Sequence, residues 1–154
     1  MRTKTLSLYL VMLTALSLPA MTHAAAALVI TQAWVREAPP ASRVLAAYMS
    51  IRNPGDAAIS IDAIVSPDFE SAELHRTVVN EGMARMLHMK QLDVPANGSV
   101  RLEPGGLHLM LFNPVRPLAA GDSVTLTLHL SNGTCLVMNT PVVRQDDGKT
   151  HQHH

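Results

Sequence analysis

The sequence contains little of several residue types that would define other classes of protein. Its single cysteine, Cys135, excludes an intramolecular disulfide, and aromatic residues make up only 3% of the chain, so the core must consist of aliphatic side chains and methionine. Twelve basic residues balance twelve acidic ones without forming a basic stripe, which argues against nucleic acid as a partner. The hydrolase motifs G-x-S-x-G and H-E-x-x-H are absent, and we expect no enzyme activity.

The one long apolar run lies near the N-terminus. A positively charged start precedes an apolar segment from Leu6 to Leu18, and small residues follow it. This pattern is typical of a secretory signal peptide, which we assign to residues 1–24, with cleavage after Ala24 or Ala26. An uncleaved anchor is the alternative, although the run is short for a membrane span. We therefore expect a periplasmic protein whose mature form does not span the membrane.

Short alternating stretches separated by Pro, Gly and Asn turn signals follow from Leu28 onward. Eight or nine such stretches without a helical period predict an all-β domain over residues 25–144, an antiparallel β-sandwich or barrel. Residues 145–154 are polar, and we expect them to form a flexible tail. Cys135 lies in one of the alternating stretches, where a buried thiol is the expectation and a free exposed thiol the alternative.

The stretch L-H-L-M-L-F, residues 107–112, is the most informative one. On a strand, His108 and Met110 project to one face and the intervening leucines to the other, so one face resembles a core and the other a site. An imidazole beside a thioether offers two neutral ligands, of which the thioether favours Cu(I) over harder ions. A structural histidine and a methionine that fills the core are the alternatives for this pair.

Three residues upstream are further candidates. Met86 lies three residues from both Met83 and Met89, so it is either a ligand on a strand or part of an apolar stripe on a helical turn. His88 would share the face of Met86 on a strand, as an alternative nitrogen ligand or a group behind the ligands. His75 lies between charged residues, where a solvated surface histidine is the ordinary expectation.

The spacing of these residues, H-x10-M-x21-H-x-M, resembles the signature of the PCuAC family of periplasmic copper(I) chaperones. Three further segments resemble family landmarks and occur in the family order: A-W-V-R at 33–36, A-A-Y-M-S-I-R-N-P-G at 46–55, and V-P-A-N-G-S-V-R-L-E-P-G-G-L-H-L-M-L at 94–111. The resemblance therefore covers nearly all of the chain that follows the signal peptide, except the tail.

The resemblance implies a cupredoxin-like β-sandwich that binds one Cu(I) through His75, Met86, His108 and Met110. It also implies delivery of this copper to the dinuclear copper centre of a respiratory oxidase, so the expected partner is an oxidase subunit or a partner copper chaperone. One departure concerns Arg76, because many members of the family have methionine directly after the first histidine. The extra thioether of those members is missing here.

The tail contains His151, His153 and His154, and imidazoles at this spacing can bind Cu(II) or Zn(II). We expect this group to capture Cu(II), while a purification tag or a chance polar end is the alternative.

Other functions remain open from the sequence. Copper storage or detoxification would use the same ligands. An electron-transfer cupredoxin needs a Cys, His and Met cluster, but Cys135 is followed by Met138 and by no histidine before the tail. A metal-free structural β-sandwich would fit the strands and leave the ligand spacing unexplained.

Overall fold

The computed structural model describes residues 27–39 and 41–144, which form ten β-strands and contain no helix. The strands are β1 (Val29–Arg36), β2 (Val44–Arg52), β3 (Ile59–Val65), β4 (Phe69–Asn80), β5 (Met83–Met89), β6 (Leu92–Val94), β7 (Ser99–Leu102), β8 (Leu107–Pro114), β9 (Ser123–Leu130) and β10 (Cys135–Val143). The prediction of a single all-β domain is confirmed. The strand that the sequence pattern did not indicate is β6, which has only three residues.

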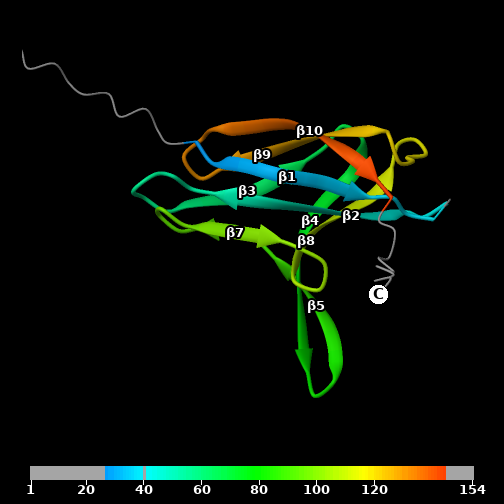
Figure 1. Cartoon of the computed structure of the whole chain (residues 1–154), viewed down its shortest axis with the longest axis horizontal. Helices are drawn as coiled ribbons and strands as arrows, with labels where there is room; N and C mark the ends of the chain where they lie inside the picture. Colours follow the sequence, from blue (N-terminus) through cyan, green and yellow to red (C-terminus); the bar gives the residue numbers. More distant parts are fainter. Residues whose placement is uncertain (1–26, 40, 145–154) are drawn as a thin grey trace, which may run out of the picture.

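The strands follow one another in the order β5-β4-β8-β2-β1-β10-β9-β3-β6, and β7 pairs with β2 (Figure 1). All pairs are antiparallel except β1 and β10, which run parallel through Val35–Val142 and Arg36–Val143. The sheet folds over at this parallel pair. We call β1, β2, β4, β5, β7 and β8 the first layer and β3, β6, β9 and β10 the second layer, and together they make the predicted sandwich.

The core lies between the two layers and is aliphatic, as the scarcity of aromatic residues predicts. Leu109 and Leu111 enter it from β8, and Leu126 and Leu128 enter it from β9, all of them 0% exposed. On β9 the leucines alternate with threonines on the outer face, the pattern of a strand that is buried on one side. On β8, likewise, only the leucines enter the core, so the outer face of the first layer carries other side chains.

A tight turn joins β4 to β5. Asn80 is paired with Met83, so only Glu81 and Gly82 form the loop, with φ of 50° and 78°. Two consecutive residues with positive φ match the right-handed twist of the strands, and glycine adopts this conformation at little cost. This turn falls at one of the Asn and Gly turn signals of the sequence.

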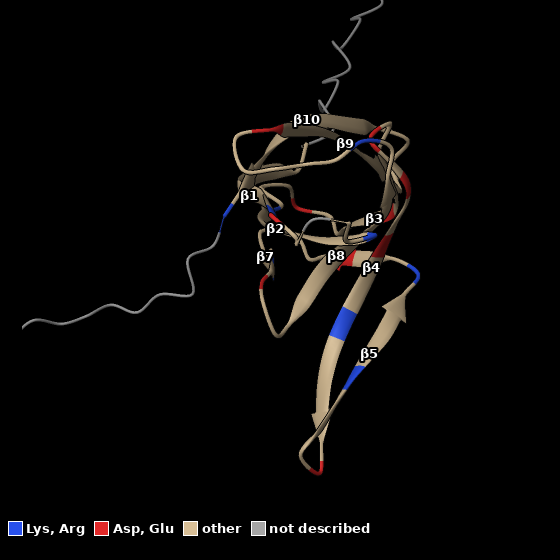
Figure 2. Ribbon diagram, turned by 90° about the vertical axis from the view of Figure 1, so that its right-hand side faces the viewer, with Lys and Arg blue, Asp and Glu red and all other residues tan. Residues whose placement is uncertain are grey.

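The β4–β5 hairpin extends beyond the rest of the sandwich (Figures 1 and 2). On its other side β4 pairs with β8 as far as Arg76–Leu107, and a last hydrogen bond joins the amide of Thr77 to the carbonyl of Gly106 at 3.0 Å. Beyond this point β4 pairs only with β5. We call residues 76–87, the projecting part of the hairpin, the arm, and the rest of the domain the body.

No helix long and apolar enough to cross a membrane occurs among the residues described.

Candidate metal centre

The two central candidates lie on β8, which has β2 on one side and β4 on the other. His108 and Met110 line a groove on the outer face of the first layer, whereas Leu109 and Leu111 project into the core. His108 is only 6% exposed, and Met110 is partly buried. The alternation predicted for this strand is therefore confirmed.

Three histidines lie side by side across three neighbouring strands. His75 on β4 is directly opposite both His88 on β5 and His108 on β8. The ring centroids are 5.5 Å apart for His75 and His88 and 6.1 Å apart for His75 and His108. Directly opposed residues share one face of a sheet, so all three imidazoles lie on the face of the first layer that also carries Met110.

The two candidate methionines lie on either side of this histidine row. Met86 is opposite Thr77 on β4, and Met110 is opposite Glu73 on the same strand. Since β5 is a strand, Met83 and Met89 project to the face opposite to that of Met86. The interpretation of the three methionines as a helical stripe is therefore wrong.

Met86, His108 and Met110 come together in one open groove of about 490 Å³. Thr77, Tyr48 and the loop that precedes β8 also line it. Neither His75 nor His88 lines this groove; His88 lines a separate hollow of about 180 Å³, together with Glu73 and Met89. The structure thus brings three of the four candidate ligands into one groove and places the fourth, His75, beside His108 in the adjoining strand.

The hydrogen bonds of the two imidazoles leave one nitrogen of each ring without a partner among the described residues. His108 Nδ1 lies 3.1 Å from the carbonyl oxygen of Gly106, which can only accept, so Nδ1 donates and Nε2 keeps its lone pair. His75 Nε2 lies 3.0 Å from a carboxylate oxygen of Glu73, and its buried Nδ1 has no hydrogen-bond partner in this part of the chain. Fixing one ring nitrogen in this way orients an imidazole for a metal at the other.

The chemistry of the donors agrees with a soft ion. Among the described residues, no group of three or more His, Cys, Asp or Glu side chains is placed to hold a metal. A metal in the groove would therefore need the methionine sulfurs, and two imidazoles with two thioethers are all neutral donors. Such a set suits Cu(I) better than ions that require carboxylate or carbonyl oxygen.

The expectation of a buried Cys135 is wrong. Cys135 begins β10 with an exposed side chain, because it is Leu136 and Met138 of this strand that pack toward the core. Its Sγ lies 3.3 Å from Nδ1 of His129, directly opposite on β9. The alternation of this strand was predicted correctly, but the choice of which alternate residues face the core was not. Neither face of this stretch is uniformly apolar.

Two groups of predicted residues lie outside the described part of the chain. These are the signal peptide, residues 1–24, and the tail with His151, His153 and His154.

Two residues of the site were not found from the sequence. Glu73 precedes His75 by two positions and therefore shares its face of β4. The alternation of side chains along a strand could have indicated this residue. Gly106 contributes a carbonyl oxygen, and no side-chain pattern can indicate a backbone acceptor.

Comparisons with known proteins identify the family of the chain. The family model "Putative lipoprotein LpqE-like" matches residues 28–142, which is most of the chain. The chain is 32% identical over 114 residues to "Putative lipoprotein Lxx21020" of Leifsonia xyli subsp. xyli, covering 73% of this chain and 68% of that protein.

Solved structures share the fold. The Cu(I)-bound solution structure of DR1885 from Deinococcus radiodurans is 31% identical, covers 82% of this chain and 83% of its own, and superposes with a TM-score of 0.63. The copper-bound PCuAC domain from PmoF2 is 19% identical, covers 77% of this chain and 93% of its own, and gives a TM-score of 0.65, a likeness in fold. The chain therefore belongs to the LpqE-like family, and its fold is that of the PCuAC domains.

Proposed function

We propose that this protein is a periplasmic copper chaperone. It binds one Cu(I) through His75, Met86, His108 and Met110 and delivers the ion to the dinuclear copper centre of a respiratory oxidase, either directly or through a partner chaperone. Its cargo is the copper ion, and no catalytic step is needed. The resemblance of the ligand spacing and the copper-bound relatives support the choice of metal.

The observation that carries the proposal is the convergence of Met86, His108 and Met110 on one groove, with His75 beside His108. These residues come from three strands, and 21 residues of the chain separate Met86 from His108. Apart from metal binding, we see no reason for two thioethers and an imidazole to line the same hollow on the outer face of a sheet.

The openness of the groove favours delivery over storage. Met86 is 60% exposed, so a ligand of another protein can approach the ion while the buried His108 still holds it. Ligand exchange of this kind allows an ion to move without being released into water. A storage site would be better served by ligands that are all enclosed.

The expected location is the periplasm. The assignment of residues 1–24 as a signal peptide supports export, and so does the word lipoprotein in the names of the family and of a relative. Mass spectrometry of the protein purified from the periplasmic fraction would test this. A new N-terminus after Ala24 or Ala26 is the expected result.

The ligand set is tested by Cu(I) titration of the metal-free protein under anaerobic conditions, in competition with a chromophoric chelator. We expect one tightly bound Cu(I) per chain and at least about a 100-fold weaker affinity in Met86→Ala. Met83→Ala is the matched control, since Met83 is 57% exposed on the same strand but faces the other way. Equal losses in both variants would contradict the assignment of Met86.

Delivery is tested by mixing the Cu(I)-loaded protein with the metal-free soluble copper domain of an oxidase. Appearance of the spectrum of the assembled copper centre after oxidation is the expected result. Retention of copper by the loaded protein would instead favour storage.

The tail is proposed to bind a second ion. Removal of residues 151–154 should lower the Cu(II) stoichiometry and leave the Cu(I) titration unchanged. Undiminished Cu(II) uptake by the truncated protein would contradict this role.

A further inference from the structure

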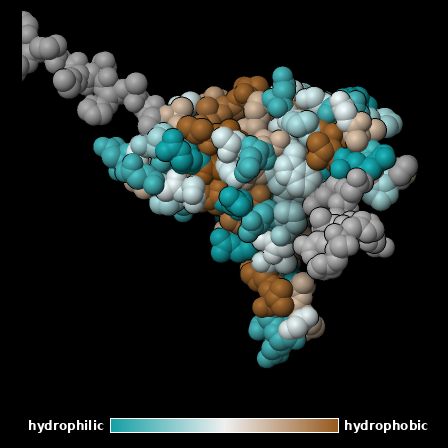
Figure 3. All heavy atoms as spheres, viewed as in Figure 1, coloured by the Kyte–Doolittle hydropathy of each residue, from teal (hydrophilic) through white to brown (hydrophobic). Residues whose placement is uncertain are grey.

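The arm carries half of the exposed large hydrophobic residues of the described chain. Val79 is 70% exposed, Met83 57%, Met86 60% and Leu87 49%. Eight large hydrophobic residues are exposed among the described residues, and these four belong to the arm, while the other four lie on separate elements. Figure 3 shows brown, hydrophobic side chains on the projection where it leaves the body. A gathering of this kind on a small exported domain indicates an interaction surface.

The arm also presents an unprotected edge of the sheet. β5 is the last strand of the strand order, has seven residues, and contains neither proline nor an acidic residue. The opposite edge is formed by β6, which has three residues, includes Asp93 and is followed by Pro95. Short length, charge and proline are the usual means of keeping an edge strand from pairing with other chains. The β6 edge has all three of these features, whereas the β5 edge has little protection beyond the charge of Arg85.

The charge of the arm differs from that of the body. In the arm, two cationic side chains, Arg76 and Arg85, stand against the single carboxylate of Glu81. In the rest of the described chain, nine carboxylates stand against seven cationic side chains. Figure 2 shows basic segments on both strands of the hairpin and an acidic one at its turn. An acidic surface would therefore approach this domain more favourably at the arm than at the rest of the described chain.

The arm is continuous with the groove. Met86 belongs to both, while Arg76 and Arg85 project to the other face of the hairpin, where they lie opposite Leu87 and Val78. A protein that contacts the free edge of β5 reaches both faces of the arm, and on the groove face it would meet Met86 without displacing the buried His108.

We infer that the arm is the docking surface for the copper acceptor, and that the matching surface of the acceptor combines apolar and acidic side chains. This inference rests on the proposed copper delivery. Along the free edge of β5 the acceptor reaches both faces of the arm: Val79 beside Met86 on the groove face, and Met83 and Leu87 with the two arginines on the other face. Met86 then lies at the contact, where an acceptor ligand can replace it.

The test uses the full mature chain and the metal-free soluble copper domain of an oxidase as the probe. Transfer of Cu(I) is followed at low and at high salt for the unmodified protein and for Arg76→Glu combined with Arg85→Glu. We expect about tenfold slower transfer by the variant at low salt and little difference at high salt. Arg101→Glu is the control, because Arg101 is an exposed residue of β7 outside the arm, and it should transfer at a rate close to that of the unmodified protein.

A second pair of variants tests the apolar contact. Val79→Ser should weaken the complex with the probe, whereas Val137→Ser should not, although the two valines are 70% and 68% exposed. Nuclear magnetic resonance shifts of the labelled metal-free protein on addition of the probe should fall on residues 76–87.

The outcomes separate this inference from the proposed function. Normal Cu(I) binding and transfer by both arm variants, with shifts outside residues 76–87, would overturn the docking surface and leave delivery intact. A concentration-dependent dimer formed through β5 would overturn it by showing that a second copy covers the arm. Absence of Cu(I) binding or of transfer by the unmodified protein would overturn both.

Discussion

Two strands of the first layer, β8 and β5, contain similar residues in contrasting surroundings. β8 lies between β2 and β4 and contacts the second layer, so that Leu109 is 0% exposed. β5 has β4 alone as a neighbour, and Leu87 is 49% exposed. Each strand nevertheless carries one histidine and one methionine on the outer face of the first layer. These are His108 and Met110 on β8, and His88 and Met86 on β5. The body thus carries the buried members of the proposed ligand set and the arm an exposed one.

Under the proposed function, this contrast would allow a small domain to hold an ion and still release it. Segments with few buried contacts open at low free-energy cost, whereas core strands open only when the whole domain unfolds. The proposed ligands on β8 would stay in place as long as the domain is folded. The proposed ligand on the arm could exchange while the fold remains intact.

The largest expected difference between body and arm concerns stability. Leu109→Ala should lower the free energy of unfolding by about 2 to 5 kcal/mol, because it leaves a cavity between the layers. Leu87→Ala should change it by less than about 0.5 kcal/mol, because Leu87 is half exposed. Urea denaturation of the metal-free variants measures both. Similar losses would mean that the arm is part of the cooperative core.

The next effect concerns Met110, which stands on a body strand but faces the groove. If it acts as a ligand, Met110→Ala should weaken Cu(I) binding by at least about 100-fold. The metal-free variant should unfold within about 1 kcal/mol of the unmodified protein, since Met110 is only partly buried. Met49→Ala, at a 2% exposed position, is the opposite case, with a large loss of stability. A loss of 2 to 5 kcal/mol in Met110→Ala, with copper affinity intact, would make it a core residue.

A smaller effect is expected for Glu73, which hydrogen-bonds His75 on the body side of the arm. Glu73→Ala should weaken Cu(I) binding by about 10-fold, because the imidazole loses the acceptor that orients it. Glu73→Gln keeps an acceptor oxygen at this position and should restore much of the affinity. Competition titrations of both variants provide the measurement. Equal affinities in all three proteins would show that His75 needs no such support.

The fold and the centre of the site could be predicted from the sequence because they follow short-range rules. The alternation in β8 separates His108 from the core leucines, whereas the spacing of the methionines around Met86 was compatible with both a strand and a helical turn. The parity of the stretch around Cys135 could not be predicted, since Val137 and Leu136 are both apolar and only one of them packs inward.

The arm could not be predicted either. Its projection depends on β8 beginning at Leu107, opposite Arg76, while β4 continues to Asn80. This offset depends on the register between the two strands. No local sequence pattern in either strand indicates that register.

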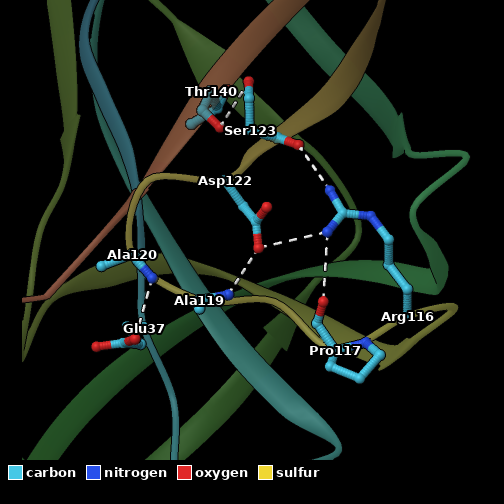
Figure 4. Close-up of polar contacts among 8 residues, drawn as sticks. All are labelled: Glu37, Arg116, Pro117, Ala119, Ala120, Asp122, Ser123 and Thr140. Carbon is cyan, nitrogen blue, oxygen red and sulfur yellow. Dashed lines mark hydrogen bonds and ion pairs between the residues drawn. The ribbon is translucent and has the colours of Figure 1, made fainter.

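The smallest effect is expected from an ion pair of the body, where β1 and β10 run parallel. Glu37 accepts hydrogen bonds from the Arg144 side chain at 2.6 Å and from the amide of Ala120 at 3.0 Å, the latter drawn in Figure 4. First the Arg144 side chain and then this amide hold the pKa of Glu37 below its usual value of 4.5. A carboxyl whose pKa is lower in the folded state stabilises the protein above the unfolded-state value, and this contribution is lost as the pH falls through the lower one. Glu37→Gln should therefore make the free energy of unfolding less dependent on pH below pH 4.5. Arg144→Gln should remove the larger part of the pH dependence that Glu37 contributes. Urea midpoints between pH 7 and pH 3 measure this dependence. An unchanged acid dependence in both variants would show that the pair contributes nothing to the stability of the body.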